Sequence, residues 1–305
     1  MGARKTVQLS LIVYVISAVC MYVLAAVSLV VPGLVGARTS PFACDDYSIR
    51  NPLKKQTVST TALILITLLA ALLIIIVTEV VIDRLSLPDR LFKWRRWRLP
   101  SLLVHAVAYL GYFQLGYAMQ VVVNQVTKYA VGRLRPHFFT VCKPEAFNCT
   151  SPGQLIYSYT CTGDAKDTEE GRLSFFSGHS SIAMYSATFL IIYLHARIGH
   201  IAPRILLSTL QTVLFTGGLF ICYTRLQDYY HHPSDIATGA VIGILGAIYS
   251  CYAWADLWYT RNGYSAVHGQ ISEEDDDDNP SAVNVDSKTN PELVNPPANI
   301  YNERL

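Results

Sequence analysis

The sequence predicts an all-α integral membrane protein built as a bundle of six transmembrane helices. Of its 305 residues, 51% are hydrophobic and only 15% are charged, and the apolar residues come in long blocks. One helical span across a bilayer core needs about 20 apolar residues. Backbone groups in hydrocarbon must find hydrogen-bond partners within their own segment, so we expect these blocks to be helices. The composition excludes an ordinary soluble domain.

Six blocks meet this length requirement. The first follows the basic pair Arg4-Lys5 and is too long for the apolar core of a cleaved signal peptide, so we interpret it as a retained signal anchor. The expected membrane domain covers residues 9–256, after a cytosolic N-terminus at residues 1–8. The predicted spans are Leu9–Val31, Ser59–Ile82, Ser101–Val126, Phe175–His195, Ile205–Tyr223 and Ile236–Trp254.

The loop Asp83–Pro100 decides the expected orientation because it is short and rich in Lys and Arg. Such loops stay in the cytosol. We therefore place both termini in the cytosol and the loops after spans one, three and five on the outer face. Residues 262–305 are polar and include the acidic run Asp275–Asp278, so we expect a disordered acidic cytosolic tail there.

Two features of the outer loops suit a non-cytosolic location. Asn148 begins an Asn-Cys-Thr sequon, which is a candidate glycosylation site. Four of the seven cysteines also fall in these loops, where disulfide bonds are permitted. Four cysteines allow three pairings, and the sequence leaves the choice open. These candidates for disulfide bonds are Cys44, Cys142, Cys149 and Cys161.

Three polar clusters interrupt the apolar sequence, each at the end of a predicted span. Lys128–Pro136 follows span three, Phe176–Ser181 opens span four, and Thr224–Asp235 joins spans five and six. Since consecutive spans alternate in direction, all three clusters lie on one membrane face in either orientation. They are therefore expected to form one site.

The residue types in these clusters suit a phosphate group. Lys128, Arg135 and Arg225 are cations from separate segments, and Arg offers a planar fork while Lys offers a point charge. Ser177 and Gly178 lie where a helix begins, so free N–H groups and the helix dipole favour an anion there, and Gly178 lets the backbone approach it. Basic residues beside a span often only mark topology, so the interpretation depends on all three clusters together.

Two histidines are candidates for covalent and acid–base chemistry. His231 lies four residues before Asp235, and a carboxylate bonded to one ring nitrogen makes the other a better nucleophile. His232, three residues before Asp235, is the rival for that role. His179 then remains to protonate a leaving oxygen.

The three clusters resemble the signature of the type 2 phosphatidic acid phosphatase superfamily. The strings GRLRPHF, GRLSFFSGHSS and DYYHHPSD most resemble the animal lipid phosphate phosphatases, and the resemblance covers roughly residues 9–256. Phe176 and Thr224 stand where many members have Pro and Ser. The motif residues are Lys128, Arg135, Pro136, Ser177, Gly178, His179, Arg225, His231 and Asp235.

This resemblance implies that His231 attacks phosphorus and forms a phosphohistidine, with Asp235 orienting His231 and His179 as general acid. It implies no metal ion or other cofactor. The implied substrates are phosphatidate, lysophosphatidate, sphingosine 1-phosphate and ceramide 1-phosphate. The residues that would hold the phosphate are Lys128, Arg135, Ser177, Gly178 and Arg225.

The resemblance also implies a multi-pass protein of the plasma membrane with an extracellular site, or of an endomembrane with a lumenal site. We expect self-association and no nucleic-acid partner.

A catalytically inactive signalling or scaffolding relative would lack several motif residues, whereas this chain has them all. A transporter or receptor would leave the clusters unexplained. Among enzymes, a lipid diphosphate phosphatase is the alternative; vanadium haloperoxidases share the site but are soluble, and glucose-6-phosphatase differs in its number of spans.

Overall fold

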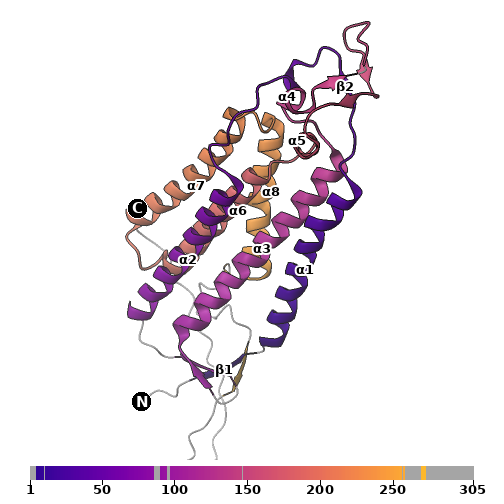
Figure 1. Cartoon of the computed structure of the whole chain (residues 1–305). Helices are drawn as coiled ribbons and strands as arrows, with labels where there is room; N and C mark the ends of the chain where they lie inside the picture. The colour runs from indigo at the N-terminus through magenta and orange to yellow at the C-terminus, as the bar shows by residue number, and fades with distance from the viewer. Residues whose placement is uncertain are drawn as a thin grey trace, which may run out of the picture. The chain divides into compact units, whose positions relative to one another are not determined.

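A computed structural model describes residues 5–9, 11–85, 90–94, 97–145, 147–255, 257 and 269–272. It is mainly helical, and its long helices form a bundle (Figure 1). Five of the described helices are long and apolar enough to cross a membrane, and the first helix contains a further apolar stretch, Ala18–Val30. The predicted all-α membrane bundle is confirmed. The long helices are α1 (Leu11–Val35), α2 (Thr60–Leu85), α3 (Ser101–Val131), α6 (Gly178–Ile198), α7 (Arg204–Gln227) and α8 (Pro233–Ala253).

Two of these helices extend beyond the apolar blocks that predicted them. α3 runs past Val126 and carries Lys128 in its last turn, and α7 runs past Tyr223 and carries Arg225. The end of α3 is set by Gly132, which has a left-handed φ of 63° and whose N–H bonds to the carbonyl of Lys128 at 3.0 Å. A Cβ on Gly132 would also lie 2.2 Å from the carbonyl oxygen of Arg38, so the position has no room for a side chain.

Helix α6 packs against α2, α3, α7 and α8. Small residues let α8 come close: a Cβ on Gly239 would lie 2.5 Å from the carbonyl oxygen of Ser177, and one on Gly243 would lie 2.2 Å from that of Ser181. Contacts of this kind are typical of helix pairs in membranes. The close packing fixes the start of α6 against the start of α8.

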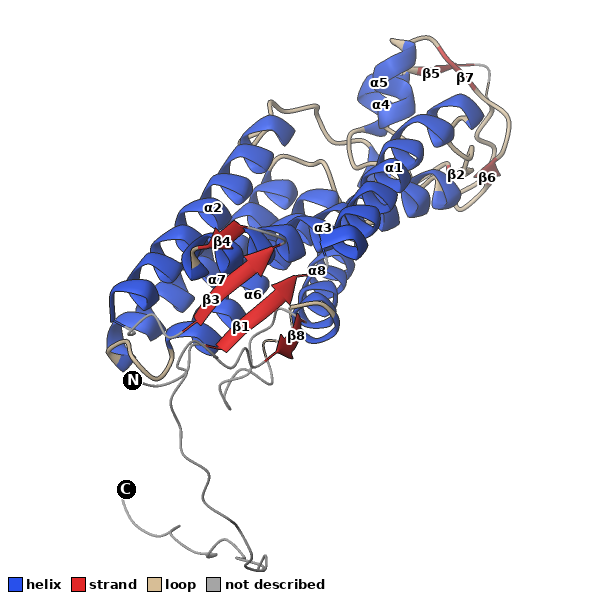
Figure 2. Cartoon of the chain, turned by 90° about the horizontal axis from the view of Figure 1, so that it is seen from below, coloured by secondary structure: helices blue, strands red, loops and turns tan. Residues whose placement is uncertain are grey.

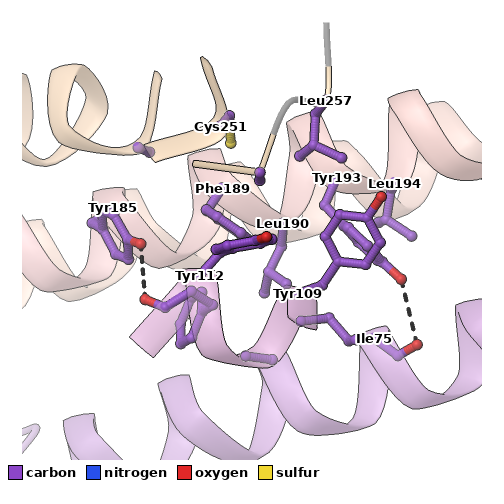
Figure 3. Close-up of a cluster of buried hydrophobic side chains, with 14 of the residues drawn as sticks. Ile75, Tyr109, Tyr112, Tyr185, Phe189, Leu190, Tyr193, Leu194, Cys251 and Leu257 are labelled. Carbon is purple, nitrogen blue, oxygen red and sulfur yellow. Dashed lines mark hydrogen bonds between the residues drawn. The ribbon is translucent and has the colours of Figure 1, made fainter. Parts of the chain in front are cut away.

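A cluster of buried aromatic and aliphatic side chains forms the core between these helices (Figure 3). Its tyrosines are not purely apolar. The hydroxyl of Tyr185 donates to the carbonyl of Phe113 at 2.9 Å, and that of Tyr193 lies 3.5 Å from the carbonyl oxygen of Ile75. Buried tyrosine hydroxyls need such partners. These bonds join α6 to α3 and to α2.

A compact cap, made by the loops at residues 36–59 and 132–177, lies at the end of the bundle where α3 ends and α6 begins (Figure 1). It has its own apolar core around Phe42, Ile49 and Phe138. Disulfide bonds join Cys44 to Cys149 and Cys142 to Cys161, which gives one of the three pairings left open by the sequence. The short elements of the cap are β2 (Phe42–Ala43), the 3-10 helix η1 (Tyr47–Ile49), α4 (Phe138–Cys142), β5 (Pro144–Glu145), β6 (Leu155–Ile156), β7 (Thr160–Cys161) and α5 (Ala165–Glu170).

A small sheet stands at the opposite end of the bundle (Figure 2). Its strands, in the order β4-β3-β1-β8, come from the segment before α1, the loop between α2 and α3 and the region after α8. All three segments therefore lie at the same end of the bundle. The strands are β1 (Lys5–Leu9), β3 (Arg90–Trp94), β4 (Trp97–Leu99) and β8 (Gly269–Ser272).

Strand β8 corrects the expectation that residues 262–305 lack regular structure. It pairs antiparallel with β1, and the register places Ile271, an apolar residue in a polar region, opposite Val7. The composition of the region does not predict this strand, because its four residues become ordered only by pairing with the edge of β1. The rest of that predicted tail lies outside the described residues.

An ion pair links α2 to α6 far from the cap. Glu79, which is 2% exposed, accepts hydrogen bonds from Arg197 Nε at 2.8 Å and Nη2 at 2.6 Å, and from the hydroxyl of Tyr193 at 2.7 Å. A buried carboxylate with three such donors is well compensated. Removal of one partner leaves the other charge buried and unpaired.

We therefore expect Arg197→Met to destabilise the protein by about 3–5 kcal/mol. The double variant Glu79→Met/Arg197→Met removes both charges, so it should recover most of that loss. The measurement is thermal unfolding of the detergent-solubilised protein. A double variant as unstable as the single one would contradict this account of the pair.

Candidate active site

The structure brings the three polar clusters together at the cap end of the bundle. Lys128 is in the last turn of α3, His179 in the first turn of α6, Arg225 near the end of α7, and Asp235 in the first turn of α8. His231 lies in the turn between α7 and α8. Lys128, Arg135 and His179 all act electrostatically on His231, which places them around one space.

Backbone hydrogen bonds join the segments that carry these clusters. The N–H of Ser174 donates to the carbonyl of Arg133 at 3.0 Å, and that of Arg135 donates to Gly171 at 2.8 Å. The N–H of Ser177 donates to the carbonyl of Asp235 at 3.1 Å. The cluster after α3 is thus bonded to the segment that leads into α6. The cluster at the start of α6 is bonded in turn to the start of α8.

The ring of His231 is held by a backbone carbonyl. Its Nδ1 lies 2.8 Å from the carbonyl oxygen of Ser174, which can only accept, so Nδ1 carries the proton. In the neutral ring the lone pair is then on Nε2. His231 is 4% exposed. Burial lowers its pKa well below the usual value, and the nearby Arg135 and Lys128 lower the pKa further. The imidazole is therefore neutral at physiological pH, with an unprotonated Nε2.

Asp235 does not bond directly to His231, although the spacing of four residues suggested that it would. Its Oδ2 lies 3.9 Å from His231 Nδ1, beyond hydrogen-bond distance. It accepts instead from the hydroxyl of Ser174 at 2.6 Å, the N–H of His232 at 3.0 Å and the guanidinium of Arg133. Asp235 thus reaches His231 through Ser174, whose hydroxyl binds the carboxylate and whose carbonyl binds the imidazole.

Ser174 and Arg133 were missed by the sequence interpretation. Both are next to recognised motifs, but neither has a spacing that marks it as functional. His232, the rival nucleophile, is the N-cap of α8, and its Nε2 lies 3.1 Å from the carbonyl oxygen of Leu134. That nitrogen donates to the backbone, so it has no lone pair to offer a substrate.

His179 presents an unpaired nitrogen. Its ring has a hydrogen bond to the backbone of Val58, and its buried Nε2 has no partner among the residues that the structure describes. A buried polar atom without a partner is rare and often marks a functional position. Lys128, Arg135 and Arg225 act on this ring electrostatically, which puts it beside the same cations as His231.

Arg135 and Arg225 are both buried, and Arg135 is only partly paired. Arg135, whose side chain is 9% exposed, has a long ion pair of 3.7 Å with Glu170 and a 3.5 Å contact with the carbonyl of Leu173. Its Nε has no partner in the described part of the chain. Arg225 is bound by Asp228 at 3.1 Å. Guanidinium donors of this kind suit the oxygens of an anion.

Ser177 and Gly178 occupy the start of α6 as expected, but they also have structural partners. The Ser177 hydroxyl accepts from the hydroxyl of Ser180 at 3.0 Å and caps the helix. Asn124 of α3 donates to the carbonyl of Phe176 at 2.9 Å, and its Oδ1 would lie 2.7 Å from a Cβ on Gly178. A side chain at position 178 would therefore displace the Asn124 amide, whether or not a ligand is bound.

Asn148 is exposed in the cap and is next to Cys149, which is bonded to Cys44.

Among the residues that the structure describes, no three His, Cys, Asp or Glu side chains form a group that would hold a metal ion.

Comparison with known proteins agrees with these motifs. Residues 109–259 match the PAP2 superfamily. A Caenorhabditis elegans protein named phospholipid phosphatase homolog 1.2 homolog is 37% identical over 77% of this chain and 70% of its own length. Human phospholipid phosphatase 2 is 36% identical over 69% of this chain and 72% of its own length.

A Drosophila melanogaster protein named putative phosphatidate phosphatase is 30% identical over 72% of this chain and 62% of its own length. No solved structure matches the chain. With this identity and coverage, and with all three polar clusters at one end of its helical bundle, the chain belongs to the PAP2 superfamily and to its lipid phosphate phosphatases.

Proposed function

We propose that this protein hydrolyses phosphate monoesters of membrane lipids through a phosphohistidine formed on Nε2 of His231. The observation that carries the proposal is the buried, neutral His231, whose Nδ1 proton is bound by Ser174 and whose surroundings include Lys128, Arg135 and His179. A neutral imidazole beside several cations is suited to attack a phosphate, because the cations offset the charge that would repel a nucleophile.

In the first step Nε2 of His231 forms a bond to phosphorus, and the bond from phosphorus to the lipid oxygen breaks. His179 gives a proton from Nε2 to the departing alkoxide. The phosphate charge lies near His179 and favours the protonated ring that this step needs. The positive charge that develops on His231 is stabilised by the Ser174 carbonyl, which Asp235 holds in place.

In the second step a water molecule attacks phosphorus and the bond to Nε2 breaks. His179, now neutral, takes a proton from that water, so orthophosphate leaves and both histidines return to their first states. Lys128, Arg135, Arg225 and the N–H groups at the start of α6 hold the equatorial oxygens in both steps. These residues supply the stabilising charge, so we propose a reaction independent of magnesium.

The substrates we propose are phosphatidate, lysophosphatidate, sphingosine 1-phosphate and ceramide 1-phosphate, which connects the enzyme to phospholipid and sphingolipid metabolism and to lipid signalling. They share a phosphate monoester on an apolar anchor. The relatives named phospholipid phosphatase and phosphatidate phosphatase support this class. A site at the end of the spans lets acyl chains stay in the bilayer while the head group reaches the histidines.

We propose that the cap and the site lie outside the cytosol, at the plasma membrane or in an endomembrane lumen, with both termini cytosolic and the chain self-associating. The disulfides Cys44–Cys149 and Cys142–Cys161 support this side, because such bonds persist in oxidising compartments. Asn148 is exposed in the same cap and would be glycosylated there.

Intact cells that express the protein should release phosphate from lysophosphatidate added to the medium. His231→Ala should reduce this release by at least roughly 10³-fold, because the nucleophile is lost. His232→Ala removes the hydrogen bond from the ring Nε2 to the Leu134 carbonyl, worth about 0.5–1.5 kcal/mol, and should affect stability more than turnover. In isolated membranes, wild-type activity should persist in chelator and be blocked by vanadate.

The nucleophile assignment is wrong if His231→Ala keeps its activity and His232→Ala loses it. Activity that appears only after cells are permeabilised would overturn the orientation, and activity restored only by magnesium would overturn metal independence. Surface biotinylation of each variant controls for its amount at the membrane.

His179→Gln should slow turnover of lysophosphatidate by about 10²–10⁴-fold, since a poor leaving group needs the proton. A substrate with an alkyl-substituted nitrophenyl leaving group needs no proton, so its first step should stay fast. The expected result is a burst of one equivalent of nitrophenol followed by slow release of phosphate. His200 is exposed and lies just beyond the far end of α6, so His200→Gln is the control and should behave as wild type. Loss of the burst together with turnover would exclude His179 as a general acid.

A further inference from the structure

Arg225 is the most buried of the three cations, at 1% exposure, and is held along one edge of its guanidinium. Nε and Nη2 contact the hydroxyl of Thr224 at 3.2 and 3.1 Å, and Nη2 also contacts Asp228 at 3.1 Å. Nη1 has the longest contact, 3.4 Å to the side chain of Gln56. Nη1 is therefore the nitrogen most available to a phosphate oxygen.

Asp228 is fixed by a segment from another part of the chain. Its Oδ2 accepts from the backbone N–H of Thr57 and its Oδ1 from the hydroxyl of Thr57, both at 2.8 Å. Asp228 is 4% exposed and ends α7, where its N–H donates to the carbonyl of Thr224 at 3.0 Å. Both oxygens are engaged, so this carboxylate is held in place rather than free to follow Arg225.

The segment Gln56–Val58 reaches two residues of the site. Gln56 contacts Arg225, Thr57 holds Asp228, and the backbone of Val58 binds the ring of His179. This segment ends two residues before the start of α2 and lies outside the region 109–259 that matches the superfamily. None of its residues belongs to the three polar clusters.

We propose that Asp228, locked by Thr57, is a positioning residue that turns Arg225 toward the substrate phosphate, and that the segment Gln56–Val58 is a fourth part of the site. The inference rests on the proposed phosphatase function. A carboxylate on the Nη2 edge leaves Nη1 to the ligand and keeps the buried guanidinium compensated when no phosphate is bound. Without it, Arg225 is held only by the neutral side chains of Thr224 and Gln56.

Asp228→Asn should lower kcat/KM for lysophosphatidate by about 10–100-fold, the effect of losing a hydrogen bond to a charged group in a buried site. Vanadate affinity should fall by a similar factor, because vanadate resembles the transferring phosphoryl group. In an Arg225→Met background, Asp228→Asn should produce no further loss of vanadate affinity, since Asp228 acts through Arg225.

Thr57 provides a matched pair that does not alter the charge of the site. Thr57→Ser keeps the hydroxyl and should stay within about twofold of wild type, whereas Thr57→Ala should lose about 3–10-fold in kcat/KM and vanadate affinity. If Asp228→Asn does not fold, this pair still decides the question. A purely structural role would lower the unfolding temperature of Thr57→Ala but leave kcat/KM per folded molecule unchanged.

Three results would overturn the proposal: wild-type kcat/KM and vanadate affinity in Asp228→Asn, a further loss in the Arg225→Met background, or equal effects of Thr57→Ala and Thr57→Ser. Failure of the phosphatase function itself would appear differently. In that case wild-type protein would show no more phosphate release than His231→Ala, whatever the Asp228 and Thr57 variants do.

Discussion

The site depends on keeping an imidazole neutral in the midst of positive charge. His231 is buried beside Arg135 and Lys128, so its protonation would be opposed both by burial and by repulsion, and its pKa is low. The Ser174 carbonyl fixes the remaining proton on Nδ1. We propose that the cations that oppose protonation of Nε2 are also the ones that attract the phosphate. In the mechanism that we propose, a single electrostatic arrangement thus prepares the nucleophile and the binding site together.

The bundle provides this arrangement by bringing helix ends together. Gly239 and Gly243 let α8 approach α6 closely, which sets Asp235 beside the start of α6, where the N–H of Ser177 bonds to its carbonyl. The disulfide-bonded cap then holds Arg133 and Arg135 against the segment that leads into α6. The cations and histidines therefore come from rigid helix ends and from backbone that is hydrogen-bonded to them.

Hydropathy and spacing were enough to predict the bundle and the candidate residues, because long apolar blocks and alternating spans leave few arrangements. Side-chain partners were less predictable. The spacing of His231 and Asp235 suggested a direct bond, yet the contact runs through Ser174, which sits on a different segment. Thr57 and Asp228 meet from distant parts of the chain, and β8 gains order only from its neighbour. Such tertiary contacts leave no mark in a single sequence.

The most direct test is to identify the residue that carries phosphate during turnover. Protein mixed with lysophosphatidate labelled on its phosphate is stopped in alkaline detergent, digested and analysed by mass spectrometry. The account predicts phosphate on His231, stable in alkali and lost in mild acid, as expected for a bond from phosphorus to nitrogen. Phosphate on His232, on a serine such as Ser177, or on no residue at all would contradict it.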